Sequence, residues 1–188
     1  MAKQLAADAI FCALMLGVTL LFSSLAYLSR SVFGVLIAAM FAFYFTGKPL
    51  VRGLTAGSAM VLLMFILQGV TLTVSVLLPN ILGGIALSIA FRREGRGYYL
   101  ISVPALAAIT AGEFWLVSTL MMGNNLFSSL QETLSKYPFI QIPEGQMGFF
   151  LTCYFICFCL VMALMKSLIA VKFCAILRRR IPQLDKLL

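Results

Sequence analysis

The chain contains the stretch MGFFLTCYFICFCLVMALM at residues 147–165, which carries no charged side chain. A run of about 20 apolar residues is long enough to cross a bilayer as an α-helix. Five further apolar runs precede it, at about 5–28, 31–46, 50–68, 70–91 and 99–122. We therefore predict an all-α integral membrane protein, a bundle of about six transmembrane helices, with residues 147–170 as the last span.

The composition of the whole chain supports this class. Of its 188 residues, 62% are hydrophobic and 11% are charged, whereas charged residues alone make up about a quarter of a soluble domain. We predict a single transmembrane domain over residues 1–188, whose first run is a retained span rather than a signal peptide. The weakest boundary is Gln68-Gly69, so five spans, or a re-entrant segment near 47–53, are alternatives.

Basic residues are unevenly divided between the two sides of the predicted bundle. With six spans, one side receives only Arg30 and Lys136. The other receives Lys3, Lys48, Arg52, Arg92, Arg93, Arg96, Arg178, Arg179, Arg180 and Lys186. Because cytoplasmic loops are enriched in Lys and Arg, we predict a multi-pass protein of the cell (plasma) membrane with both termini cytoplasmic.

Two segments lie outside the predicted spans. Residues 123–146 form the long outer connection, in which apolar residues at helical spacing predict an amphipathic helix, either passive at the interface or a cap over a pocket. The basic tail at 172–188 is expected to continue the last helix and to anchor it at anionic membrane lipids. A docking surface for a cytoplasmic partner is the alternative for this tail.

Several function classes are disfavoured by the residue types present. The chain has no histidine, so a serine-histidine or cysteine-histidine couple is excluded, and no glycine-rich loop precedes a lysine. Its five cysteines fall in predicted helices without metal-ligand partners. The basic residues are dispersed over short loops, which disfavours a nucleic-acid surface. We expect no enzymatic activity, no metal and no cofactor.

The stretch AGEFWL at residues 111–116 places a carboxylate inside the fifth predicted span. An ionised carboxylate at that depth must be paired or face a wet cavity, because its burial in hydrocarbon is costly. We expect an outward-open pocket that binds substrate through Glu113, with neighbours from the end of the span and the outer connection: Thr110, Trp115, Asn124 and Asn125. The alternative is a protonated glutamate bonded to a backbone carbonyl between helices.

Lys166 is the obvious counter-charge for Glu113. It follows the apolar run at 147–165, which should place it near the inner surface with its stem extended to water. We therefore do not expect a direct pair between Glu113 and Lys166.

Ala9 and Ala13 form an Ala-x-x-x-Ala pair in the first predicted helix. Small residues four apart allow two membrane helices to approach closely. The partner helix is either another helix of this chain or a helix of a second protein.

A basic chain of this length, with six predicted helices, the pair Ala9 and Ala13 and an outward-facing polar site, resembles the substrate-binding S component of energy-coupling factor (ECF) transporters. The stretches FAFYFTGKPLVRGLTAG and LLPNILGGIALSIAFRREGRGYYL are also similar to the YybS-like membrane family, which is related to S components. The resemblance implies a six-helix subunit that captures a small vitamin-like solute from outside. It further implies delivery by a coupling membrane subunit, contacted through Ala9 and Ala13, and by ATPase subunits.

Two other function classes remain open. A non-catalytic membrane scaffold of the cell-wall elongation machinery, of the MreD type, has a similar size and span count and would bind proteins rather than a solute. A membrane enzyme using Glu113 lacks a second acid, base or metal ligand converging with it in the sequence. A small molecule that copurifies with the protein would favour the transport subunit over the scaffold.

Overall fold

The computed structural model describes residues 2–23, 27–93, 96–121, 128, 132 and 146–180. All regular structure within these ranges is helical, in keeping with the need of a chain in lipid to satisfy its backbone groups internally. The elements are α1 (Ala2–Ser23), α2 (Tyr27–Phe45), α3 (Leu50–Leu72), the π-helical turn η1 (Thr73–Leu77), α4 (Leu78–Ala90), α5 (Arg96–Met121) and α7 (Met147–Arg180).

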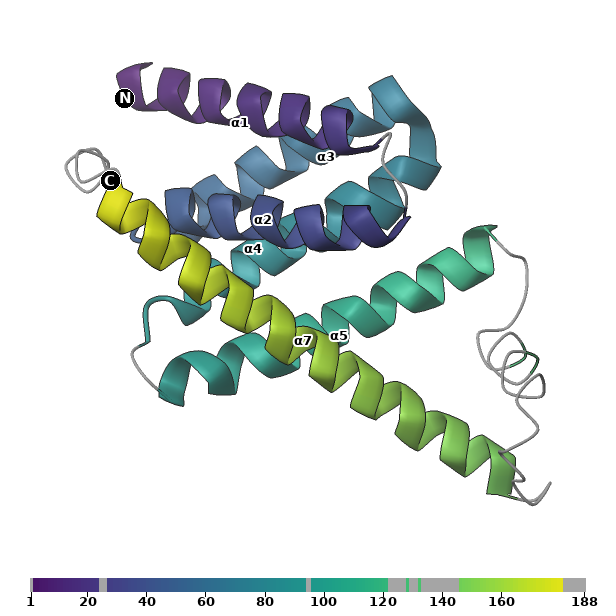
Figure 1. Cartoon of the computed structure of the whole chain (residues 1–188). Helices are drawn as coiled ribbons and strands as arrows, with labels where there is room; N and C mark the ends of the chain where they lie inside the picture. The colour runs from purple at the N-terminus through teal and green to yellow at the C-terminus, as the bar shows by residue number, and fades with distance from the viewer. Residues whose placement is uncertain are drawn as a thin grey trace.

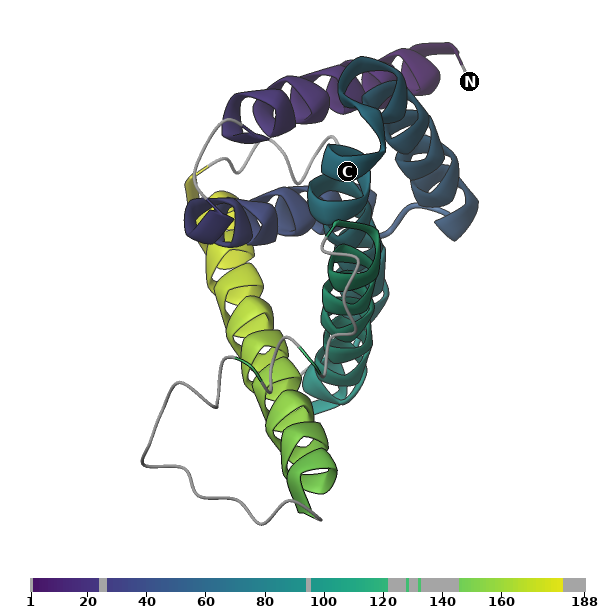
Figure 2. The same ribbon diagram turned by 90° about the vertical axis from the view of Figure 1, so that its right-hand side faces the viewer.

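The helices run alternately in opposite directions (Figure 1). The start of α1, the turns at 46–49 and 91–93 and the end of α7 lie at one end of the molecule, which we call the basic end because it carries most of the arginines and lysines. The turn at Gly69 and the start of α7 lie at the other end. Viewed from the side, α5 and α7 extend away from the group formed by α1 to α4 (Figure 2).

The chain reverses direction at Gly69. This glycine has φ 76° and ψ −177°, a non-helical conformation inside the helical run Leu50–Ala90, and only glycine adopts such a positive φ without strain. The helices before and after Gly69, α3 and α4, then pack on each other, since a Cβ added to Gly57 in α3 would lie 2.7 Å from the Ile81 side chain in α4. The break predicted at Gln68-Gly69 is therefore present.

The core has two halves that share α2 and α4. On one side, Met15, Phe41, Met60, Met64 and Leu77 pack together from α1, α2, α3 and η1. On the other side, α2 and α4 pack against α5 and α7, largely through small residues. The buried residues of this half are Ala38, Ala39, Ala42, Leu87, Ala90, Tyr98, Leu106, Ala163, Ala170 and Cys174. Small residues at helix contacts let membrane helices pack by close van der Waals contact.

Among the described residues, four helical stretches are long and apolar enough to cross a membrane: Gln4–Leu21, Leu50–Ala90, Arg96–Thr119 and Met147–Leu177. Gly34–Phe45 is a shorter apolar helix. The fold is thus that of an all-helical, multi-pass membrane protein, while the count of six spans is not confirmed. The prediction that the last helix continues into the basic tail is confirmed as far as Arg180.

Candidate functional site

Polar side chains follow one face of α5 where it packs on α7. Tyr98 donates a hydrogen bond to the carbonyl oxygen of Ser167 at 3.1 Å, and the hydroxyls of Ser102 and Ser167 lie 2.8 Å apart. Further along α5, Thr110 is 1% exposed and Glu113 lies one turn beyond it. Residues three or four apart share a helix face, so these groups form one polar seam within an apolar pair of helices.

The seam contains a direct pair between Glu113 and Lys166. The Nζ atom of Lys166 lies 3.9 Å from Oε2 of Glu113 and donates a hydrogen bond to the Oγ1 atom of Thr110 at 3.1 Å. The side chains of Lys166 and Glu113 are only 18% and 15% exposed. The expectation that these two residues would not pair is therefore wrong.

The prediction that Glu113 and Lys166 do not pair was wrong because it did not consider the direction in which the lysine side chain extends. Ser167 contacts Ser102, so the backbone at Lys166 lies opposite a position well before Glu113 on α5. Long side chains on a helix point back toward its N-terminus, and the lysine stem runs that way along α7 to Thr110 and Glu113. It therefore carries its ammonium group away from the basic end rather than toward it.

The other predicted site residues are placed differently. Trp115 is 59% exposed, on a different side of α5 from Thr110, and the structure does not bring it into the Glu113 cluster. Phe114 instead packs edge-on against Phe155 and Phe158 of α7, with ring centroids 6.2 and 5.5 Å away. Asn124 and Asn125, and most of the outer connection at 123–146, lie outside the described residues.

A second ionic cluster, centred on Asp8 of α1, was missed in the sequence. Asp8 accepts a hydrogen bond from the hydroxyl of Tyr44 at 2.9 Å and lies 3.4 Å from Nζ of Lys48 and 3.6 Å from Nε of Arg52. It is the only carboxylate residue before Glu94 and lies in the mostly apolar stretch of α1 that follows Lys3 and Gln4. The reasoning applied to Glu113 would have found it.

The Asp8 cluster joins α1 to the turn between α2 and α3. The ammonium group of Lys48 lies 3.3 Å from the centre of the Tyr44 ring, and Phe11 stacks on that ring at 3.9 Å. Burial lowers the pKa of Lys48, while the negative charge of Asp8 acts in the opposite direction. Arg92 donates to the carbonyl oxygen of Lys48 at 2.7 Å, which adds the turn after α4 to the same end.

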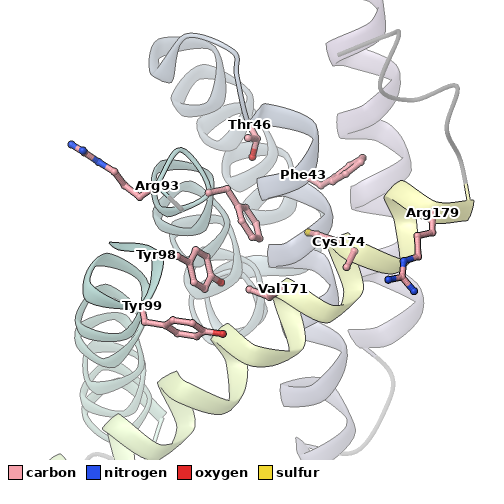
Figure 3. Close-up of a pocket in the computed structure, with 10 residues that line it drawn as sticks. Phe43, Thr46, Arg93, Tyr98, Tyr99, Val171, Cys174 and Arg179 are labelled. Atoms are coloured by element: carbon pink, nitrogen blue, oxygen red, sulfur yellow. The ribbon is translucent and has the colours of Figure 1, made fainter. Parts of the chain in front are cut away.

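A pocket of about 720 Å³ lies at the basic end, between α2, the turn after α4, α5 and α7. We call it the basic-end pocket. Its charged and aromatic lining residues are Phe43, Phe91, Arg93, Tyr98, Tyr99 and Arg179 (Figure 3). It is separate from the Glu113–Lys166 pair, neither residue of which lines it. No sequence motif marks it, because its walls come from four separate segments.

Ala9 and Ala13 are exposed on α1. A shallow groove of about 460 Å³ runs beside them, lined by Ile10, Ala13, Leu14, Gly17, Val18 and Leu21, and nothing lies within 4 Å of a Cβ added to Gly17. The alternative in which this pair packs against another helix of the same chain is thus not what the described residues show. None of the residues that the structure describes covers this face.

Comparisons of the chain with protein-family models, with curated proteins and with solved structures give no match.

Proposed function

We propose that the protein is the solute-binding membrane subunit of an ECF-type importer, with both termini in the cytoplasm. The observation that carries the proposal is the Glu113–Lys166 pair with Thr110, held between two membrane-spanning helices. Ionisable groups at such depth are costly and mark solute or ion pathways in membrane proteins. The pair supplies an anionic and a cationic group side by side, as a small polar solute requires.

The pair retains capacity for a ligand. A distance of 3.9 Å is an ion pair but exceeds hydrogen-bond length. Lys166 has three donor hydrogens, of which Thr110 accepts one, and a carboxylate offers several acceptor positions. A solute that bears an amine, a carboxylate or a polar ring edge can therefore bond to either group without displacing the other. We propose a vitamin-like compound of this class.

The exposed face of α1 supports the other half of the proposal. An import subunit of this type needs a membrane surface on which a coupling subunit packs, and the ATPase subunits act through that contact. Ala9 and Ala13, together with the groove beside them, offer a face that another helix can approach closely. A cell-wall scaffold would use the same face, so the two functions differ in whether a solute binds.

The solute is tested by mass spectrometry of small molecules released from the purified protein. We expect a polar compound to be retained by the unmodified chain and to bind Glu113→Gln more weakly. The loss should be roughly 1.5–3 kcal/mol if the compound is cationic, the scale of a charge-assisted hydrogen bond, and less if it is neutral. Unchanged affinity in both Glu113→Gln and Glu113→Leu would remove Glu113 from the site.

Release of no compound, with capture of wall-synthesis proteins, would favour the scaffold.

The partner face is tested by the double variant Ala9→Leu/Ala13→Leu. Bulky side chains should hold a partner helix away, so we expect loss of the complex with the coupling subunit and unchanged solute binding. Ala7→Leu is the control, because Ala7 is also exposed on α1 but lies on another side of it. Assembly and transport that survive the double change would show that this face is not the contact.

A further inference from the structure

The basic-end pocket is lined by Arg93, Arg179 and two tyrosines. The two arginines lie on opposite sides of the tyrosines, and the guanidinium group of Arg93 points outward from the pocket (Figure 3). Arg93 comes from the turn after α4 and Arg179 from the last turn of α7, and both are exposed. Among the described residues, neither forms an ion pair with a carboxylate, and no carboxylate lines the pocket. By contrast, Lys48 and Arg52 at the same end are paired with Asp8. Within the part of the chain that the structure describes, the pocket therefore presents two positive charges without a carboxylate partner.

Guanidinium groups bind phosphate through paired, charge-assisted hydrogen bonds, so arginines that line a pocket favour a phosphate-bearing ligand. The remaining walls are suited to an amphiphile. Phe43, Phe91 and Val171 supply apolar surface for an acyl chain. Tyr99, which is 36% exposed, adds an aromatic ring with a polar hydroxyl group. At about 720 Å³, the pocket has room for more than a phosphate ion.

The location of the pocket identifies the source of that phosphate. It lies where α5 begins and α7 ends, beside the ends of the apolar stretches Arg96–Thr119 and Met147–Leu177. Tyrosine and arginine at the ends of membrane helices lie at the level of the lipid headgroups, where basic pockets between helices bind anionic headgroups. We infer that the basic-end pocket binds the phosphate-bearing headgroup of an anionic phospholipid from the leaflet on that side.

The inference is tested by titrating the purified protein with phosphatidylglycerol and with phosphatidylcholine of the same acyl chains, followed by native mass spectrometry. We expect phosphatidylglycerol to bind about tenfold more tightly, and Arg93→Gln/Arg179→Gln to abolish that preference. The matched control is Arg96→Gln/Lys172→Gln. It removes the same charge from exposed positions near the same end that do not line the pocket, so the preference should be kept.

Three results would overturn the inference. Equal binding of the two lipids by the unmodified protein would show that the pocket does not recognise an anionic headgroup. An equal loss in both double variants would assign the preference to general surface charge. Binding of soluble glycerol 3-phosphate as tight as that of phosphatidylglycerol, with the same dependence on Arg93 and Arg179, would assign the pocket to a free phosphate compound. The comparison of the two lipids needs no variant, so it stands even if one variant fails to fold.

Discussion

Replacing Lys166 by methionine is expected to lower the free energy of unfolding by about 3 kcal/mol. The change keeps much of the apolar stem but leaves Glu113 without its counter-charge between α5 and α7. Removing one partner of a buried ion pair costs about 3–5 kcal/mol, because an uncompensated charge remains. We place the value at the low end because both side chains keep some exposure. Unfolding in mixed detergent and SDS micelles measures this loss.

Lys172→Met is the control for this variant, since Lys172 is an exposed lysine on the same helix. Its effect should lie within about 0.5 kcal/mol of zero, as for most surface changes. The double variant Glu113→Leu/Lys166→Met should regain a large part of the stability, because apolar replacement of both partners removes the buried charges together. If Lys166→Met is as stable as Lys172→Met, the pair does not contribute to the fold.

Replacing Gly84 by leucine is expected to have the other large effect, a loss of about 3 kcal/mol in the free energy of unfolding or failure to fold. A Cβ at this position would lie 2.9 Å from Cβ and Cδ1 of Phe41 and 3.0 Å from the backbone oxygen of Ala38. Two of these atoms are held close to the α2 backbone, so α2 and α4 would have to separate. Even a few extra methylenes in a close-packed core cost about 1–3 kcal/mol. Thermal unfolding in detergent provides the measurement.

Gly112→Leu serves as the matched control, since nothing lies within 4 Å of a Cβ added to Gly112 in α5. It should be neutral or slightly stabilising, because glycine is about 1 kcal/mol less favourable than alanine or leucine inside a helix. A similar loss in both leucine variants would mean that helix propensity or insertion, rather than the contact of α2 with α4, determines the outcome at Gly84.

Much of the fold could be predicted from the sequence because each helix is a long apolar run, and most of these runs are separated by charged or helix-breaking residues. The turns at Gly47-Lys48-Pro49, Gly69 and Arg92-Arg93 fall between the predicted runs. The break predicted at Ser29-Arg30, between the first two runs, is wrong, because α2 begins at Tyr27 and continues through both residues. The helix pairs were not predictable. The close contact of α2 with α4 depends on which small residues face each other, and hydropathy along these apolar helices does not indicate which faces meet.

The candidate site was predictable only in part. A lone acid in an apolar run identified Glu113, and helical spacing brought Thr110 to its side. The partner Lys166 was excluded by an estimate of depth that located the backbone and ignored the direction of a long side chain. The basic-end pocket is formed by segments far apart in the sequence, so spacing along the chain carried no signal for it.

The attachment of α1 has a consequence for how the protein is made. The charge of Asp8 in α1 is matched by Lys48 and Arg52, which follow α2 in the sequence. Elsewhere α1 turns large apolar side chains outward, as Leu5, Leu14 and Leu21 show. The pairs of Asp8 with Lys48 and Arg52 therefore cannot form until the chain has been synthesised past Arg52. The attachment of α1 at the basic end thus depends on the turn between α2 and α3, which is synthesised after α1.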